Sequence, residues 1–446
     1  MSVTRALARY VVQSDYDDIP ADVRQEAIRA LFNFVGCTVG GASDEACDIA
    51  IRTFGPFSGP REAAIIGRGE RLDPLHASLL NGIASHIHDY DDTTPKNYIH
   101  PTSPVASALF AYASVNPVSG RDLLHAFILG FEATSRIGNA VFPAHYDVGW
   151  HITGTAGVFG AAAAIGKLIA LDEQQMVWAL GLAATQAAGI REMFGSMGKA
   201  FHPGRAAQNG YGAALLAQNG FTSGEFGIEG PRGFAAVQAA SYELSRITDR
   251  LGEDFDLREN TYKPFPCGIV NHPTIDACIQ LKGEHRLDAE QISQVRLHVA
   301  PLVMDLCGKR DITKGLEGKF SVVHGAAVGL VRGKAGLEEY TDAAVNDPEV
   351  KRVREATRAQ ADAAISEDSV RVEIELSDGT VVSKYLEHSL GNLKRPMTND
   401  QLEAKFVDQA VRVLPKAQVS DLVALSWDIE SLGQASDVVN ASVPST

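Results

Sequence analysis

Polar side chains that could carry chemistry are most concentrated in residues 86–104. This stretch contains three histidines and three aspartates, and it includes Asp89, Asp92, Thr93 and His100. Neighbouring imidazoles and carboxylates could form an active-site loop at the end of an apolar helix. A metal site is a second interpretation, although no His-Glu-x-x-His motif is present. A third is that Asp and Thr end one helix and cap the next. Spacing alone favours this capping over catalysis and places metal binding last.

The second cluster is the segment 149–157, Gly-Trp-His-Ile-Thr-Gly-Thr-Ala-Gly, which contains His151. A single histidine beside a tryptophan at the start of a buried helix is usually part of the core. The glycines and threonines around it leave backbone N–H groups free near a helix N-terminus, where carboxylates and other anions are favoured. The segment therefore indicates either a core histidine or an anion-binding site.

The third cluster is basic and holds Arg191, Lys199, His202 and Arg205. A Walker phosphate loop is excluded, because the glycines lie too close together and alanine, rather than Ser or Thr, follows Lys199. The cations suit recognition of a small polyanion. The local alternative is a solvated basic loop, and the local sequence alone favours it.

The fourth cluster is the Tyr-Lys-Pro-Phe-Pro-Cys segment that runs through Lys263 to Cys267. It falls where a helical pattern gives way to a mixed one, and domain junctions are favoured places for ligand clefts. Cys267 could be a nucleophile, but no Cys-His signature surrounds it and a buried structural cysteine is the more common case.

Helical periodicity dominates the part of the chain that would carry the first three clusters. Apolar residues after Pro20 recur with the spacing of one helix face, and Gly40 and Gly41 follow as stop signals. Small residues in the later helices predict close helix packing. The further predicted helices cover residues 74–87, 104–115, 121–137, 157–171 and 174–190.

The pattern changes near residue 290. Apolar and polar residues alternate over 294–300, and 370–383 reads as two strands joined by an Asp-Gly turn. A charged amphipathic helix is predicted between them at 350–365, and a capping box at Thr398 begins another helix. The fold class is therefore mainly α with an α+β second domain. We predict an all-helical domain of residues 1–265 plus 397–446, and an inserted α+β lid domain of residues 266–396.

Composition limits the classes of function. The chain has 446 residues, a formal net charge of −15 and a hydrophobic fraction of 45%, which argues against disorder and against a nucleic-acid or anionic-membrane partner. Its five scattered cysteines form no CxxC pair, so neither a zinc site nor a disulfide framework is indicated. The first residues lack the pattern of a secretory signal, and we expect a cytoplasmic protein.

Together the four clusters resemble the MmgE/PrpD family. The resemblance rests on motifs that occur in order over nearly the whole chain: His-Asp-Tyr-Asp-Asp-Thr, His-Pro, Gly-Trp-His-Ile-Thr-Gly-Thr, Gly-Lys-Ala-Phe-His-Pro-Gly-Arg-Ala-Ala and Lys-Pro-Phe-Pro-Cys. It implies a helical domain, completed by the C-terminal helices, plus an α+β lid, usually in a homodimer. It also implies activity on small di- or tricarboxylates without a metal or organic cofactor.

The residues that match positions lining the family's active site are Asp89, Thr93, His100, His151, Lys199 and Lys263. Activities in the family include 2-methylcitrate dehydration, cis-aconitate decarboxylation and epimerisation of iminodisuccinate. One loop departs from the dehydratases and decarboxylases: Thr-Pro-Lys-Asn-Tyr-Ile at 94–99 is about one residue longer and adds the cation of Lys96. Length and this loop are most similar to the epimerising members, so epimerisation is the first expectation and the dehydratase or decarboxylase activity the alternative.

These reactions all build negative charge on a carboxylate next to the reacting carbon, which cations and N–H donors must stabilise. Two residues among Lys199, Lys263 and His151 are expected to form the acid–base pair. Asp89 and Asp92 would orient or tune them. The remaining predicted site residues, expected to hold substrate, are His100, Thr93, Arg191, Arg205 and His202.

Overall fold

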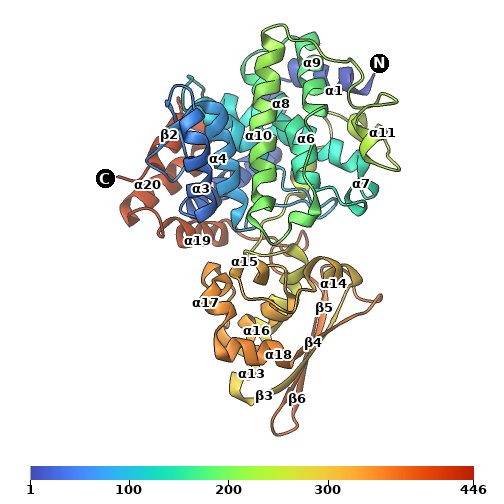
Figure 1. Ribbon diagram of the computed structural model, residues 1–446, viewed down its shortest axis with the longest axis vertical. Coiled ribbons are helices and arrows are strands. Elements are labelled where there is room, and N and C mark those ends of the chain that lie inside the picture. Colours follow the sequence, from blue (N-terminus) through green and yellow to red (C-terminus); the bar gives the residue numbers. More distant parts are fainter. Residues whose placement is uncertain (1, 446) are drawn as a thin grey trace.

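The computed structural model describes residues 2–445 and has a large helical part above a smaller part that contains helices and a sheet (Figure 1). The helices of the N-terminal segment are α1 Val3–Gln13, α2 Ala21–Gly41, α3 Glu45–Phe54, α4 Pro74–Ile87, α5 Thr102–Ala113, α6 Gly120–Val141, α7 Ala144–Asp147, α8 Ile152–Leu168, α9 Glu173–Ala184, α10 Met197–Gln218, α11 Phe234–Gln238 and α12 Ser245–Thr248. A two-residue strand pair, β1 Ala63–Ala64 and β2 Arg71–Leu72, lies between α3 and α4.

Small residues allow the central helices α4, α6, α8 and α10 to approach closely, as the sequence predicted. A Cβ atom added to Gly82 of α4 would lie 2.4 Å from the Cα of Gly204 in α10. A Cβ on Gly130 of α6 would lie 2.7 Å from the carbonyl oxygen of Gly160 in α8. Real Cβ atoms do not come so near to backbone, so these crossings require glycine. They fix the ends of α4, α8 and α10, from which several candidate side chains project.

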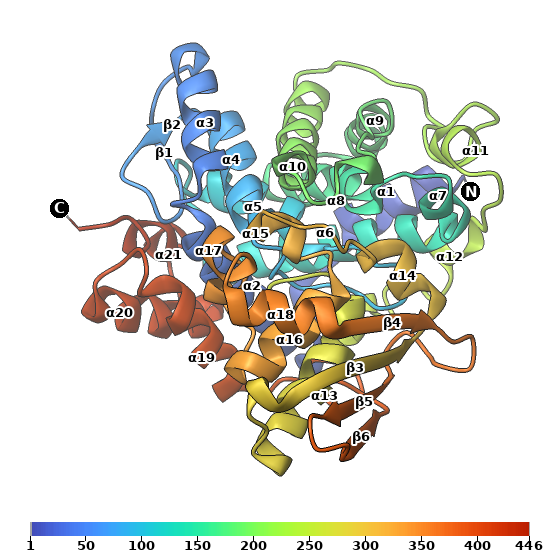
Figure 2. The same cartoon turned by 60° about the horizontal axis from the view of Figure 1, so that its bottom comes forward.

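The second part carries a four-stranded mixed sheet with the order β4-β3-β5-β6, seen at the front of Figure 2. Strand β3 pairs in parallel with β4 and antiparallel with β5, and β5 and β6 form the hairpin that the Asp-Gly turn predicted. Its elements are α13 His272–His285, β3 Ile292–Val299, α14 Pro301–Cys307, α15 Gly315–Gly318, α16 Val322–Arg332, α17 Asp342–Val345, α18 Pro348–Ala356, β4 Thr357–Ala361, β5 Val370–Leu376 and β6 Val381–Leu386.

Two helices are shorter in the structure than the sequence pattern predicts. The helix predicted at 350–365 ends at Ala356, and β4 Thr357–Ala361 follows it. Pairing with the open edge of β3 recruits this segment into the sheet, an effect that helical periodicity cannot reveal. The helix predicted at 174–190 ends at Ala184, and the chain then forms the loop that carries Arg191.

The C-terminal helices α19 Asn399–Ala410, α20 Lys416–Trp427 and α21 Ser436–Ala441 return to the helical part, where they lie beside α2 and α5. The ring of Phe32 in α2 packs 4.7 Å from Phe406 and 3.9 Å from Trp427, measured between centroids. Thr398 and Gln401 form the predicted capping box at the start of α19.

Buried apolar residues form one large core from residues 7–262 and 397–439, and a separate core from residues 267–386. The exact domain boundaries at 265/266 and 396/397 remain predictions. Across residues 2–445, no helix combines the length and the apolar character that membrane crossing requires.

Candidate active site

A small cavity lies where loops of the helical part meet α14 and the segment before α16. We call it the inner pocket. Its volume is about 40 Å³, enough for a few water molecules. Its walls are Asp89, Thr93, Tyr98, His100, Tyr146, His151, Phe194, Lys199, Lys263, Gly268, Ile269, Val270, Leu306, Cys307 and Phe320.

Asp89 is the electrostatic centre of the inner pocket. Its Oδ1 accepts a hydrogen bond of 2.5 Å from the ammonium of Lys199 and one of 2.8 Å from the ammonium of Lys263. All three side chains are buried. Asp89 has a positive φ of 52° just after α4 ends, which turns the chain out of the helix and toward the lysines. Thr93 and Thr261 exchange backbone hydrogen bonds of 2.9 and 3.0 Å, which hold the segment that carries Lys263 beside this loop.

The two lysines control the ionisation of the site. Burial alone would raise the pKa of the Asp89 carboxyl, but Lys199 and Lys263 outweigh it and hold that pKa well below its usual value. Burial, together with the charge of Lys263, lowers the pKa of Lys199, although Asp89 opposes the shift. Within the inner pocket the two ammonium groups face the single carboxylate of Asp89, and the second carboxylate of the cluster, that of Asp91, lies beside His86 and His100. The two ammonium groups would attract an anionic substrate, although the total charge of the chain is negative.

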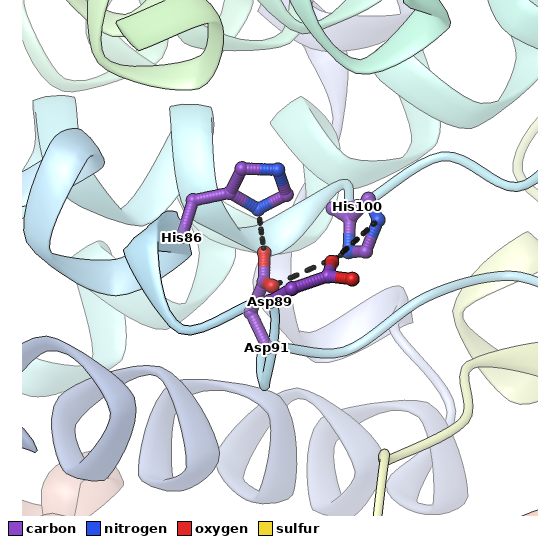
Figure 3. A group of neighbouring side chains, drawn as sticks. All are labelled: His86, Asp89, Asp91 and His100. Carbon is purple, nitrogen blue, oxygen red and sulfur yellow. Dashed lines mark hydrogen bonds and ion pairs between the residues drawn. The ribbon is translucent and has the colours of Figure 1, made fainter. Parts of the chain in front are cut away.

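Asp91 lies behind Asp89 and holds two imidazoles (Figure 3). The Nδ1 of His86 lies 2.8 Å from Asp91 Oδ2, and the Nδ1 of His100 lies 3.4 Å from Asp91 Oδ1 and 2.8 Å from the carbonyl oxygen of Asp92. These acceptors place the proton on Nδ1 of both rings, so each Nε2 is left as an acceptor. Burial lowers the pKa of His100, and burial lowers the pKa of His86 to about 4, so both rings are neutral near pH 7.

His151 is the N-cap residue of α8, and its ring lines the inner pocket. Its Nδ1 lies 2.8 Å from Nδ1 of His202 on α10, so one of these two nitrogens donates to the other. Burial, followed by the nearby charge of Lys199, holds the pKa of His151 well below its usual value. The ring is therefore a neutral imidazole beside an ammonium group, at the positive end of a helix dipole.

Two further buried lysines support the loop that carries Asp89. Lys319, from the second core, donates to the carbonyl oxygens of His88 at 2.6 Å and Pro266 at 2.8 Å. Lys405, on α19, donates to the carbonyl oxygen of Tyr90 at 2.7 Å. The loop is thus fixed from the α+β part and from the C-terminal helices. Neither lysine is distinguished by the local sequence, because a cation that acts on a loop so distant along the chain leaves no local pattern.

A metal ion is the alternative occupant of this cluster. Ligand atoms of His86, Asp89, Asp91 and His100 all lie within 4.8 Å of one another, and these types of side chain do bind metals. The Asp89 carboxylate, however, is already neutralised by two ammonium groups at hydrogen-bonding distance. A divalent cation here would lie beside both of those charges, so the donor set fits the lysines better than a metal. The absence of a metal cofactor remains a prediction.

Six of the predicted site residues face the inner pocket: Asp89, Thr93, His100, His151, Lys199 and Lys263. His202 lies directly behind His151 and can act only through it. The sequence did not predict His86 and Asp91 as individual site residues, although both lie within the segment 86–104 that it identified as a possible active-site loop. It also missed Tyr98, Tyr146, Phe194 and Phe320, which nothing in the local sequence distinguishes from ordinary aromatic residues.

The two arginines do not reach the inner pocket. Arg205 is exposed on α10 and bonds to Gln208, so its predicted role in holding substrate carboxylates does not fit its position. Arg191 donates to the carbonyl oxygen of Tyr146 at 2.9 Å and pairs with Asp305 at 3.1 Å. It therefore supports Tyr146 instead of facing the cavity.

Asp92 is buried beside the inner pocket and does not line it. Its Oδ2 accepts hydrogen bonds from Thr102 and from Asn260, the latter at 2.7 Å. Burial, reinforced by the negative charge of Asp91, raises the pKa of Asp92 to about 7. Its position favours a structural role over the catalytic one that the sequence suggested.

Lys96 also lies away from the chemistry. Its ammonium is 3.5 Å from Asp256 and 3.5 Å from Glu259, and the side chain is half exposed. The additional cation noted in this loop therefore forms surface ion pairs and is not among the residues that line the inner pocket. Tyr98 is the residue of the same loop that does line the inner pocket.

Buried neutral histidines predict a loss of stability in acid. Burial lowers the pKa of His86 to about 4, of His272 to about 3 and of His324 to about 4. In the unfolded chain these rings take up protons near pH 6.5, so the unfolded state binds more protons between about pH 6.5 and 4. The free energy of unfolding should therefore fall as pH decreases through this window, by up to ~1.4 kcal/mol per pH unit for each histidine. Denaturant unfolding at pH 7.5, 6 and 5 measures this slope, and equal stability at all three values would contradict it.

Comparison with known proteins agrees with the two-part fold. The model of the MmgE/PrpD N-terminal domain matches residues 5–246, and that of the MmgE/PrpD C-terminal domain matches residues 265–429. The chain therefore belongs to the MmgE/PrpD family. A cis-aconitate decarboxylase of Aspergillus terreus is 28% identical over 98% of this chain and 95% of its own length. The cis-aconitate decarboxylases of Mus musculus and Homo sapiens are each 24% identical over 98% of this chain, and over 92% and 93% of their own lengths.

Proposed function

We propose that this chain catalyses bond breaking at a carbon next to a carboxylate of a small polycarboxylate, without a cofactor, and that cis-aconitate decarboxylation is the reaction to test first. The observation that carries the proposal is the pair of buried ammonium groups on Asp89, with neutral His100 and His151 on the same small cavity. The relatives named above support decarboxylation over the epimerisation that the sequence alone favoured.

Decarboxylation would use the cations to stabilise charge. The carbon–carbon bond to the departing carboxylate breaks, its electron pair stays on the substrate, and CO₂ leaves. The pair delocalises onto a remaining carboxylate, which the ammonium groups of Lys199 and Lys263 stabilise. A proton then passes from an acid to the substrate carbon, and Lys199 is the candidate donor because burial has lowered its pKa toward the working range.

Epimerisation of iminodisuccinate is the second candidate, because Tyr98 of the longer loop lines the inner pocket. In this reaction a neutral imidazole, for which His151 is the candidate, takes the α-hydrogen as a proton. An ammonium group returns a proton to the opposite face of the carbon. The same residues thus serve both reactions, and the substrate decides between them.

The inner pocket is smaller than a tricarboxylate, so binding requires the walls to separate. The rings of Phe194 and Phe320, one from each part of the molecule, lie 5.8 Å apart and cover the ammonium of Lys199 at 5.2 and 5.5 Å. Movement of the α+β part would uncover the lysine, in keeping with the predicted lid. A homodimer, a cytoplasmic location and the lack of nucleic-acid or membrane partners remain predictions.

The test is a panel of substrates with the purified wild-type protein. With cis-aconitate we expect CO₂ release that persists after prolonged chelator treatment. With iminodisuccinate in deuterated water, proton NMR reports exchange of the α-hydrogen and any change of stereoisomer. A new double-bond absorbance with 2-methylcitrate would indicate dehydration. If none of these signals rises above a blank without protein, the proposed function is wrong.

A further inference from the structure

A second, smaller space also borders the Asp89–Lys199 pair, and we call it the side void. Its volume is about 10 Å³, close to the space that one water molecule needs. Asp89, Lys199 and Phe320 line both the side void and the inner pocket, whereas His86 lines only the side void. The void therefore connects His86 with the charged pair at the centre of the site.

Two hydrogen-bond acceptors belong to residues of this void. Among residues 2–445, neither Nε2 of His86 nor Oδ2 of Asp89 has a hydrogen-bond partner, and both atoms are buried. Asp91 keeps the proton of His86 on Nδ1 through their contact of 2.8 Å, so Nε2 can only accept. Because an unpaired buried acceptor destabilises the fold, a donor placed between these two atoms would be stabilising.

The Lys199 ammonium has donors to spare. It carries three N–H groups, and one of them donates to Asp89 Oδ1 at 2.5 Å, its only hydrogen bond within the part of the chain that the structure describes. The rings of Phe194 and Phe320 lie 5.2 and 5.5 Å from the nitrogen and offer it their faces. Since Lys199 lines both spaces, its two other N–H groups can serve the inner pocket and the side void.

We propose that His86 is a positioning residue for Lys199, and that one water molecule bound in the side void connects them. The water accepts a hydrogen bond from the Lys199 ammonium and donates its two hydrogens to His86 Nε2 and Asp89 Oδ2. Three hydrogen bonds are usual for a buried water. With one N–H held by Asp89 and a second by the water, the third is directed into the inner pocket. This catalytic consequence rests on the proposed function, because it assumes that the substrate binds at Lys199.

Two substitutions of His86 separate the roles of its two ring nitrogens. In His86→Asn the amide takes the place of Nδ1 and can still donate to Asp91, but nothing replaces Nε2. In His86→Gln the amide reaches the place of Nε2 and can accept from the water, but the bond to Asp91 is lost. With the best substrate of the panel, we expect kcat to fall about tenfold in His86→Asn and to stay within about threefold of the wild type in His86→Gln. If His86 served only to hold Asp91, the order would be reversed.

His125→Asn is the matched control. His125 is a buried histidine of α6 that bonds to Ser14 at 2.9 Å and lines neither space, so its loss should leave kcat within about twofold of the wild type. A crystal structure of the wild-type protein that resolves ordered water tests the site without any variant. We expect one water within about 3.2 Å of His86 Nε2, Asp89 Oδ2 and Lys199 Nζ.

The inference is overturned if the crystal structure shows no such water, or if His86→Asn is at least as active as His86→Gln, and either result leaves the proposed function intact. Thermal melts check that both variants fold, and if one does not, the wild-type crystal structure decides alone. If no substrate of the panel is turned over, the proposed function fails, whereas the presence or absence of the water still decides whether His86 contacts Lys199 through it.

Discussion

Replacing Lys199 with methionine is expected to lower kcat by about 10²–10⁴-fold, the usual contribution of a positioned acid or base. Methionine keeps much of the length and apolar surface of lysine but supplies neither charge nor proton. Folding should survive, because Asp89 keeps its hydrogen bond of 2.8 Å to Lys263. Steady-state kinetics with the best substrate of the panel, combined with a thermal melt, separates lost chemistry from lost structure.

Lys96→Met is the matched control for this experiment. It removes the same kind of charge from a side chain that pairs at the surface with Asp256 and Glu259. Its kcat should stay within about twofold of the wild type, because exposed ion pairs contribute little. Equal activity of the Lys199→Met variant and the wild type would remove Lys199 from the mechanism, and an equal loss in both variants would show that the effect is not specific to the site.

Replacing Asp89 with asparagine is expected to destabilise the protein as well as inactivate it. The change leaves two buried ammonium groups without their shared carboxylate, and breaking a buried ion pair in this way costs about 3–5 kcal/mol. At about 2.1 cal/mol/K per residue, the 446 residues give an entropy of unfolding of roughly 0.9 kcal/mol/K, so a fall in Tm of about 3–5 °C is expected. Calorimetric scanning measures it.

The control for Asp89→Asn is Asp22→Asn, which breaks a surface pair with Arg258. An exposed pair contributes about 0–1 kcal/mol, so Tm should barely change. A double variant, Asp89→Asn with Lys199→Met, removes one of the stranded charges and should recover part of the lost Tm but none of the activity. If the Asp89→Asn variant had the same Tm as the wild type, the two buried ammonium groups would not need the Asp89 carboxylate for stability. The electrostatic account of the inner pocket would then be wrong.

The helices could be predicted from the sequence because each one depends mainly on the residues within it and at its two ends. A period of 3.6 residues, a proline near the start and a stop signal at the end predicted α2 and α4, and α4 spans Pro74–Ile87 as expected. The two-residue alternation around the Asp-Gly turn likewise predicted β5 and β6. Each pattern reports a single element and the face that it buries.

Local sequence patterns fail to predict the structure where pairing or packing between residues far apart in the chain determines it. The segment at Thr357 became a strand because β3 offered an open edge. Lys96 is an additional cation in the loop 94–99, and only the structure shows that it pairs with Asp256 and Glu259 at the surface. Arg205 was predicted to hold substrate, but it projects from the exposed face of α10.

The candidate side chains themselves were largely predictable, since residue type and motif are properties of the chain. Their arrangement was not. Lys199 and Lys263 lie 110 and 174 residues from Asp89, yet both ammonium groups bond to one of its oxygens. Lys319, 231 residues from His88, supports the same loop from the other part of the molecule. Only the packing of α10 against α4 and α8, with the α+β part beside them, brings these charges into one buried space. There, the lysine charges outweigh burial and hold the pKa of Asp89 well below its usual value, and burial lowers the pKa of Lys199.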